Sequence, residues 1–206
     1  MKKNSLMIAF CLLLTPIFSQ TNPYEKDIKT VYDTIAAAGS RGDWDKVLDH
    51  TYPKIFTIAP REQMRKLISK TFTDTSEIKV TIVYGRPDSV SVDTLLVDNE
   101  LFVILYDSKK MQIVLKDVLA EPEKDHKFTI DMMKGIFTTQ YGEENVMYDE
   151  KTATFDILKK KGVNLCSNMS NTRAIDSWTI MEIKFDQPAL LQKLLPNEVI
   201  EWIKLH

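Results

Sequence analysis

The 206-residue chain has two cysteines, three histidines and no internal apolar run near the roughly 20 residues that a membrane-spanning helix needs. Two cysteines exclude a disulfide-built scaffold. His50, His126 and His206 are far apart, and no HExxH or CxxC pattern occurs, so we expect no transition-metal site. No GxGxxG, P-loop or GxSxG pattern supports a nucleotide cofactor or a hydrolase nucleophile. We therefore expect no cofactor.

The charges of the chain are nearly balanced. It has 27 Lys+Arg and 29 Asp+Glu, which give a formal net charge of −2, and no long block of one sign. This balance does not predict a surface that binds nucleic acid. Apolar residues make up 44% of the chain, a fraction typical of folded globular proteins and not of disordered ones.

The N-terminus has the pattern of an export signal. Two lysines precede the apolar run 6–14, a break follows, and Ser19 offers a small residue at the cleavage point. The run is too short to span a bilayer. We interpret residues 1–19 as a signal peptide, which predicts a periplasmic or extracellular protein with no membrane segment in its mature form. The alternative is a short buried helix at the N-terminus.

Helical periodicity recurs along the remaining chain. Apolar residues are spaced three or four positions apart, and proline, asparagine, aspartate or glycine stands at several of the expected ends. The pattern predicts helices over residues 23–39, 44–52, 60–72 and 128–141, and two short helices after Pro188 and Pro196.

Elsewhere the pattern favours strands, because apolar and polar residues alternate or form short apolar runs. The predicted strands are 78–84, 90–97, 101–106, 111–115, 146–148, 154–158, 163–166 and 178–185. The polar stretches between them are interpreted as turns. Among these, Lys159-Lys160-Lys161-Gly162 is interpreted as a solvated turn and not as an anion site. Cys166 lies in a predicted strand, which suits a buried thiol.

Helices followed by meandering strands predict an α+β protein. We expect N-terminal helices packed on a strongly curved, cone-shaped antiparallel sheet. A helix is expected to be inserted near residues 119–145, and short helices are expected to end the chain. Residues 20–206 are expected to form one domain.

Several stretches carry a resemblance to a known family. They are Gly42-Asp43-Trp44-Asp45-Lys46-Val47-Leu48-Asp49, Tyr52-Pro53 and Pro60-Arg61-Glu62-Gln63-Met64. This arrangement resembles secreted members of the nuclear transport factor 2-like superfamily, which includes ketosteroid isomerase-like and polyketide cyclase-like proteins. The resemblance implies helices that close a conical, bent antiparallel sheet. The superfamily contains enzymes and non-enzymes, so the resemblance leaves the function open.

Asp49 and Tyr52 are the candidate catalytic residues. They are three positions apart on a short predicted helix, so we expect them to share a face. Inside a cavity, desolvation would raise the pKa of the carboxyl group and make it a general base, while the phenol would donate to an oxyanion. The alternative is a solvated Asp49 and a Tyr52 packed in the core. Tyr32, Tyr84 and Tyr106 are candidate pocket walls or ordinary core residues.

Two main hypotheses of function follow. The preferred one is an exported, non-catalytic module that binds a small apolar ligand or a protein partner. It predicts no inward pair of titratable groups within hydrogen-bond reach, and an enclosed Asp–Tyr or Asp–His pair would count against it. The alternative is an acid–base enzyme of the isomerase, dehydratase or cyclase type, which needs a carboxylate in an apolar cavity. A homodimer formed through an exposed face is a third hypothesis.

Overall fold

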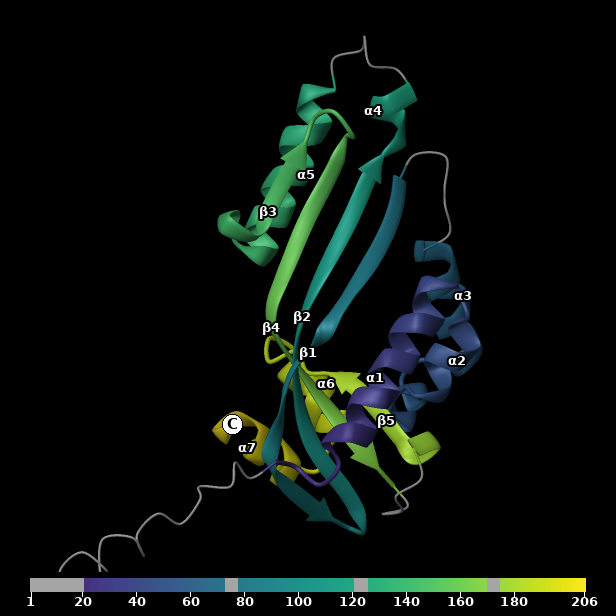
Figure 1. Ribbon diagram of the computed structural model, residues 1–206, viewed down its shortest axis with the longest axis vertical. Coiled ribbons are helices and arrows are strands. Elements are labelled where there is room, and N and C mark those ends of the chain that lie inside the picture. The colour runs from purple at the N-terminus through teal and green to yellow at the C-terminus, as the bar shows by residue number, and fades with distance from the viewer. Residues whose placement is uncertain (1–20, 73–77, 121–125, 170–174) are drawn as a thin grey trace, which may run out of the picture.

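The computed structural model describes residues 21–72, 78–120, 126–169 and 175–206 (Figure 1). The predicted signal peptide, residues 1–19, lies outside the described residues. Of the described helices, none combines the length and the apolar content that a bilayer crossing requires.

Helices occupy both ends of the described chain. The first are α1 (Glu25–Ser40), α2 (Trp44–Asp49) and α3 (Arg61–Phe72), and the last are α6 (Pro188–Leu194) and α7 (Asn197–Leu205). The 3-10 helices are η2 (Pro53–Thr57), η3 (Glu143–Asn145) and η4 (Ile175–Ser177). Two further helices, α4 (Lys116–Ala120) and α5 (Lys127–Tyr141), lie between strands β2 and β3 in the sequence. The inserted helix predicted over 128–141 is therefore confirmed as α5.

Three long strands form the body of the sheet: β1 (Ile78–Val97), β2 (Glu100–Leu115) and β4 (Thr154–Asn168). They pair antiparallel in the order β1-β2-β4. Two short strands also pair antiparallel with β4: β3 (Val146–Asp149) with its first part and β5 (Trp178–Glu182) with its last part. The predicted α+β class with an antiparallel sheet is confirmed.

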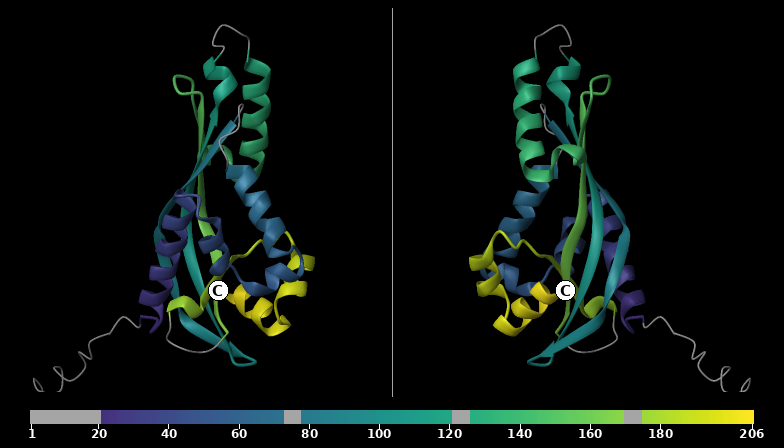
Figure 2. Two further views of the ribbon diagram at one scale, coloured as in Figure 1. Left: turned by 90° about the vertical axis from the view of Figure 1, so that its right-hand side faces the viewer. Right: turned by 90° about the vertical axis from the view of Figure 1, so that its left-hand side faces the viewer.

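The long strands pass through two regions that are covered differently (Figures 1 and 2). We call the region around residues 101–106 of β2 the lower half and the region around residues 111–115 the upper half. The lower half has α1 on one face and α6 and α7 on the other. In the upper half, α5 packs against the sheet.

Each half has its own apolar clusters. In the lower half, Leu101 and Val103 belong to the cluster under α1, whereas Phe102 and Ile104 belong to the cluster under α6 and α7. In the upper half, Ile113 and its neighbours pack against the inner residues of α5. These α5 residues are Ile130, Met133, Phe137 and Tyr141. The core is thus divided among three clusters along one long sheet.

Three segments predicted as turns lie inside continuous strands. Residues 85–89 belong to β1, residues 107–110 to β2 and residues 159–162 to β4. The pairing register shifts where these segments meet, at Asp107 and Lys109 of β2, which marks β-bulges in the neighbouring strands. The turn predictions were wrong because a short polar run inside a bulged strand has the same composition as a turn.

Other boundaries also differ. The helix predicted over 44–52 ends at Asp49, because the chain turns into η2 at Pro53. The turn predicted at Asp98-Asn99 is confirmed, and both residues have positive φ, 50° and 65°, as a tight two-residue hairpin requires.

Candidate functional site

Two charged residues interrupt the apolar side of β2 between the halves. The odd-numbered residues from Leu101 to Leu115 are apolar except Asp107 and Lys109. Asp107 is completely buried, and the side chain of Lys109 is 19% exposed. Charges are strongly disfavoured in such places unless they are paired. The partners of these two residues therefore define a candidate site.

Five side chains from four elements form a connected chain of polar contacts. The Tyr32 hydroxyl of α1 donates a 2.8 Å hydrogen bond to Asp107 Oδ2. Lys109 Nζ lies 3.2 Å from the same oxygen and 3.4 Å from Glu182 Oε2 of β5. The ammonium of Lys159, on β4, pairs with the other Glu182 oxygen. We call these five residues the polar cluster.

The ion pairs of the cluster shift the pKa values of Lys109 and Glu182. Burial alone would lower the pKa of Lys109, but Asp107 and Glu182 outweigh it and raise that pKa. Burial alone would raise the pKa of Glu182, but Lys159 and Lys109 hold it below its ordinary value. Both shifts move away from neutral pH, so neither residue exchanges a proton there.

Gly162 leaves room for the Asp107 side chain. The two residues are paired across β4 and β2, and a Cβ atom on Gly162 would overlap Asp107 Oδ1. The glycine of the predicted lysine-rich turn is therefore a packing requirement of a strand. Among the described residues, Asp107 Oδ1 has no hydrogen-bond partner.

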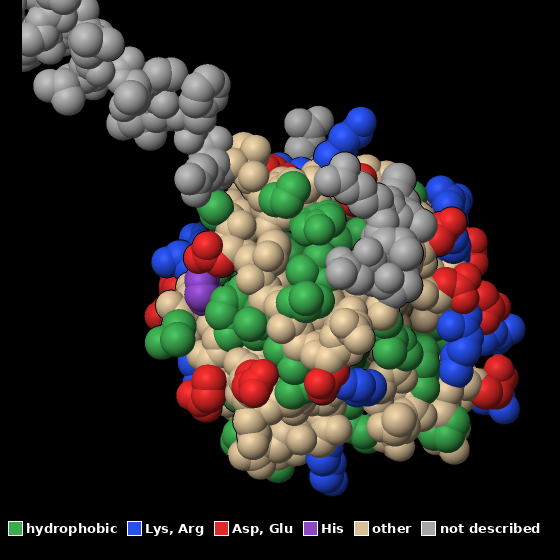
Figure 3. All heavy atoms as spheres, turned by 90° about the horizontal axis from the view of Figure 1, so that it is seen from below, with side chains coloured by type: hydrophobic (Ala, Val, Ile, Leu, Met, Phe, Trp, Pro, Cys, Tyr) green, Lys and Arg blue, Asp and Glu red, His purple; other side chains and the backbone are tan. Residues whose placement is uncertain are grey.

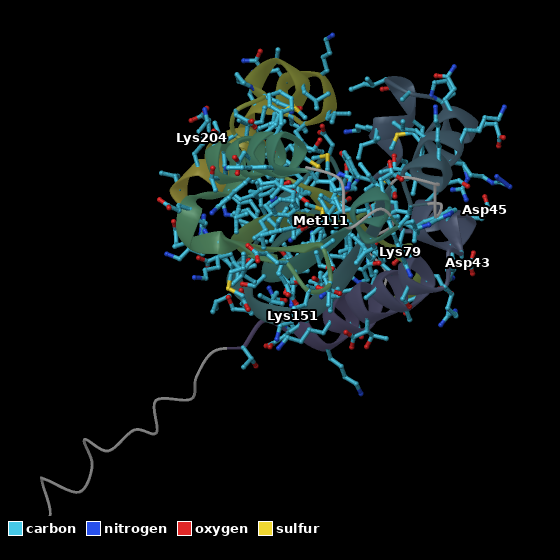
Figure 4. The ribbon with its side chains drawn as sticks, turned by 90° about the horizontal axis from the view of Figure 1, so that it is seen from above. Asp43, Asp45, Lys79, Met111, Lys151 and Lys204 are labelled. Atoms are coloured by element: carbon cyan, nitrogen blue, oxygen red, sulfur yellow. The ribbon has the colours of Figure 1, made fainter. Side chains whose placement is uncertain are left out.

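A cleft of about 550 Å³ opens beside the cluster, and Lys109, Lys159 and Glu182 form part of its lining. The last turn of α5, η3, and the chain that follows β5 complete the walls. Seen from above, Met111, which also lines the cleft, lies near the middle of the molecule (Figure 4). The volume falls in the range of small-molecule sites.

Apolar and polar groups share the cleft. Its apolar lining includes Ile82, Met111, Ile157 and Phe185. Its charged lining consists of Lys109, Lys159, Lys160, Lys184, Glu182 and Asp186, so four lysines face two carboxylates. Seen from below, the lower end of the molecule also has Lys and Arg interspersed with Asp and Glu around its edge (Figure 3).

One neutral side chain of the cleft has an unused acceptor. Asn145 Nδ2 donates to the Tyr141 carbonyl oxygen at 2.8 Å and to Glu144 at 3.0 Å. Asn145 Oδ1 is buried and has no partner among the described residues. Such an acceptor is a group that a bound molecule can satisfy.

The structure separates the two predicted catalytic residues. Asp49 is the last residue of α2; its side chain is 54% exposed and lies 2.8 Å from Arg61 Nη2. Tyr52 lies beyond the helix and is buried in the cluster under α6 and α7. Neither residue lines the cleft.

The carboxylate near Tyr52 is Glu100. Burial raises the pKa of Tyr52, and the charge of Glu100 adds to the shift. Glu100 accepts a hydrogen bond from Ser167 and lies 3.7 Å from Lys54 Nζ. This second polar group is inside the core, since Glu100 and Ser167 are buried.

The predicted pocket tyrosines have different positions. Tyr32 belongs to the polar cluster behind the cleft. Tyr106 packs against the cluster under α6 and α7, and its hydroxyl donates to the His206 carbonyl oxygen at 3.0 Å. The Tyr84 side chain lies outside the described residues. The tyrosine that lines the cleft is Tyr141, whose pKa is raised by burial and then by Glu182.

The prediction of a buried thiol is confirmed, because Cys166 is a free, buried cysteine. Its pKa is raised by burial and by the nearby charge of Asp107, so the thiol is unreactive. No group of His, Cys, Asp and Glu within the described ranges is placed to hold a metal ion. Comparisons with protein families, curated proteins and solved structures gave no match.

Proposed function

We propose that this chain is a non-catalytic binding module whose cleft takes a small ligand. The observation that carries the proposal is the cleft of about 550 Å³, whose lining combines apolar side chains with charged ones. Pockets that bind small molecules have this composition, in which apolar surface supplies affinity and a few polar groups fix orientation.

The charged residues of the lining favour binding over proton transfer. A general acid or base works best when its pKa lies near the working pH. The pKa of Lys109 is raised and that of Glu182 is lowered, so both groups stay charged at neutral pH. Groups that keep their charge can orient a ligand, but they do not transfer protons to it or accept protons from it.

One observation favours the alternative of an acid–base enzyme. Tyr32 and Asp107 form an enclosed pair at 2.8 Å, which is the kind of pair that counts against a binding module. However, neither residue lines the cleft, whereas Lys109, which contacts Asp107, does. A general base must reach the proton that it removes, so we rank this function second.

We also propose that the protein acts after export, on the support of the leader pattern in residues 1–19. The resemblance to the nuclear transport factor 2-like superfamily likewise stays a proposal. It is supported by helices that precede a curved antiparallel sheet. The helices inserted between β2 and β3 depart from the expected pattern.

A neutral apolar fluorophore, N-phenyl-1-naphthylamine, tests the cleft directly. Its emission rises when it enters an apolar site, and we expect saturable binding to the protein. Phe185 lines the cleft and is 50% exposed, so Phe185→Asp changes the wall with little effect on folding. We expect this variant to weaken binding by about tenfold, or about 1.4 kcal/mol.

The matched control is Phe128→Asp. Phe128 lies on α5, is 80% exposed and does not line the cleft. We expect this variant to bind the fluorophore as the wild type does. Equal weakening by both variants, or no saturable binding by the wild type, would contradict a ligand site in the cleft.

A further inference from the structure

We infer that the ligand of the cleft is an anionic amphiphile, a molecule with an apolar body and one carboxylate or similar acidic head. The inference rests on the proposed function and goes further, because it names the chemical class of the ligand. The apolar surface and the charge of the cleft each support one part of this description.

The apolar body matches the inner wall. Ile157 is almost completely buried and Met111 is partly buried, and both line the cleft next to the apolar cluster under α5. Phe185 adds an exposed ring to the wall. A bound apolar group removes the exposed parts of Met111 and Phe185 from water, which favours binding by about 25 cal/mol per Å². Ile157 is already buried and adds only contact.

The acidic head matches the excess of lysines. Four lysines and two carboxylates in the lining leave a formal charge of +2, and Asp107, buried behind Lys109, reduces it to +1. The excess lies at the rim, because Lys160 and Lys184 are exposed. Neither of them forms an ion pair within the described part of the chain. An anionic head at the rim would pair with both.

The ion pairs of Glu182 explain why a cationic ligand fits the cleft poorly. Glu182 is already held by Lys109 and Lys159, so it has little remaining attraction for a cation. A cationic head could reach Glu182 only by displacing Lys109 or Lys159. The displaced ammonium would then be close to the positive charge of the ligand and without its partner. The expected orientation therefore places the acidic head at the rim and the apolar body inward.

Three amphiphiles with the same tail and different heads test this inference: decanoate, decanol and decyltrimethylammonium. Each is used below its micelle concentration to displace N-phenyl-1-naphthylamine from the wild-type protein. We expect decanoate to compete at about tenfold lower concentration than either of the others. Raising the salt concentration from about 20 mM to about 300 mM should weaken the binding of decanoate and leave the binding of decanol unchanged, because salt screens exposed charges.

Substitutions at the rim locate the head group. The double variant Lys160→Gln, Lys184→Gln should weaken decanoate binding about tenfold, and should weaken binding of the neutral fluorophore by much less. The matched control is Lys151→Gln, Lys204→Gln, which removes two exposed lysines at the periphery of the molecule (Figure 4). We expect this control to bind decanoate normally.

The outcomes separate the two proposals. If the fluorophore binds in the cleft and the three heads compete equally, or the cation competes best, the inference is overturned and the proposed function remains. The inference also fails if both lysine pairs have the same effect on decanoate. If Phe185→Asp has no effect on the fluorophore, the cleft is not its site and both proposals fail.

Discussion

In the lower half of the sheet, β2 is covered on both faces, and Leu101–Leu105 form an uninterrupted buried run. In the upper half, the same strand contributes residues to the cluster under α5 only, and buried Ile113 and Leu115 alternate with partly exposed neighbours. The difference shows that one strand can have two sequence patterns. Where layers cover both faces, apolar residues are continuous, and where one face is covered, they alternate with more exposed residues.

The candidate site lies where the covering layers change. On the odd-numbered side of β2, α1 reaches Asp107 through Tyr32, and the cluster under α5 begins at Met111. Lys109 lies between the two and faces the cleft. The cleft therefore lies where α5 begins to cover the odd-numbered side of β2, beyond the part that α1 covers.

Cavity-forming substitutions give the largest expected effect. Phe102 of the lower half and Phe155 of the upper half are both completely buried, so Phe102→Ala and Phe155→Ala should each lower the free energy of unfolding by about 3–5 kcal/mol. Because three strands cross both halves, urea unfolding followed by fluorescence and circular dichroism should show one transition. Two separate transitions in Phe155→Ala would show that the upper half folds independently.

The next test removes the buried charge of Asp107 at the junction, the point where the lower and upper halves meet. Asp107→Asn keeps the volume but leaves Lys109 with one partner fewer, and we expect a loss of about 3 kcal/mol in urea unfolding. The double variant Asp107→Asn, Lys109→Met should lose less free energy of unfolding than the sum of the losses in the two single variants. Each single variant leaves the other residue without its partner, whereas the double variant removes both partners. Strict additivity would mean that the two side chains do not interact.

Glu182 gives the boundary between the two halves a pH-dependent contribution to stability. The folded pKa of Glu182 is below its ordinary value of 4.5, so the unfolded chain takes up this proton first as the pH falls. The contribution of Glu182 is present above the unfolded pKa and is lost on acidification through the folded pKa.

Urea unfolding between about pH 7 and about pH 3 measures this contribution. The wild type should lose more stability over this interval than Glu182→Gln does. Parallel decreases in the two proteins would show that the ion pairs of Glu182 contribute nothing to folding.

The smallest effect is expected outside both halves, at the exposed Asp49. Its ion pair with Arg61 is in solvent, so Asp49→Asn should change the free energy of unfolding by less than about 1 kcal/mol. Fluorophore binding should stay the same. A strong loss of binding in a folded Asp49→Asn protein would favour the original pair of candidate residues over the cleft.

Local features of this fold were predictable from the sequence. The helix predicted over 128–141, the turn at Asp98-Asn99 and the strand around Cys166 follow from periodicity and turn chemistry, which act over a few residues. The α+β class follows from their order. These predictions need no knowledge of which strands pair.

Apart from Tyr32, the residues of the candidate site were not predicted, because the site depends on pairing over long distances. Residues 107–110 and 159–162 have turn-like compositions, and only the register of β2 with β4 shows that they lie side by side. One signal was present: the odd-numbered apolar series of β2 continues at Met111 after the break. A true turn would have no reason to preserve that phase.

The most direct test of the account is to titrate decanoate into isotope-labelled protein and follow backbone amide shifts by NMR. We predict saturable shifts at Lys109, Asn145 and Phe185, with little change in α3 or at the turn formed by Asp98 and Asn99. Shifts confined to the exposed side of α5 around Phe128, or no saturable shifts at all, would contradict a binding site at the junction of the two halves.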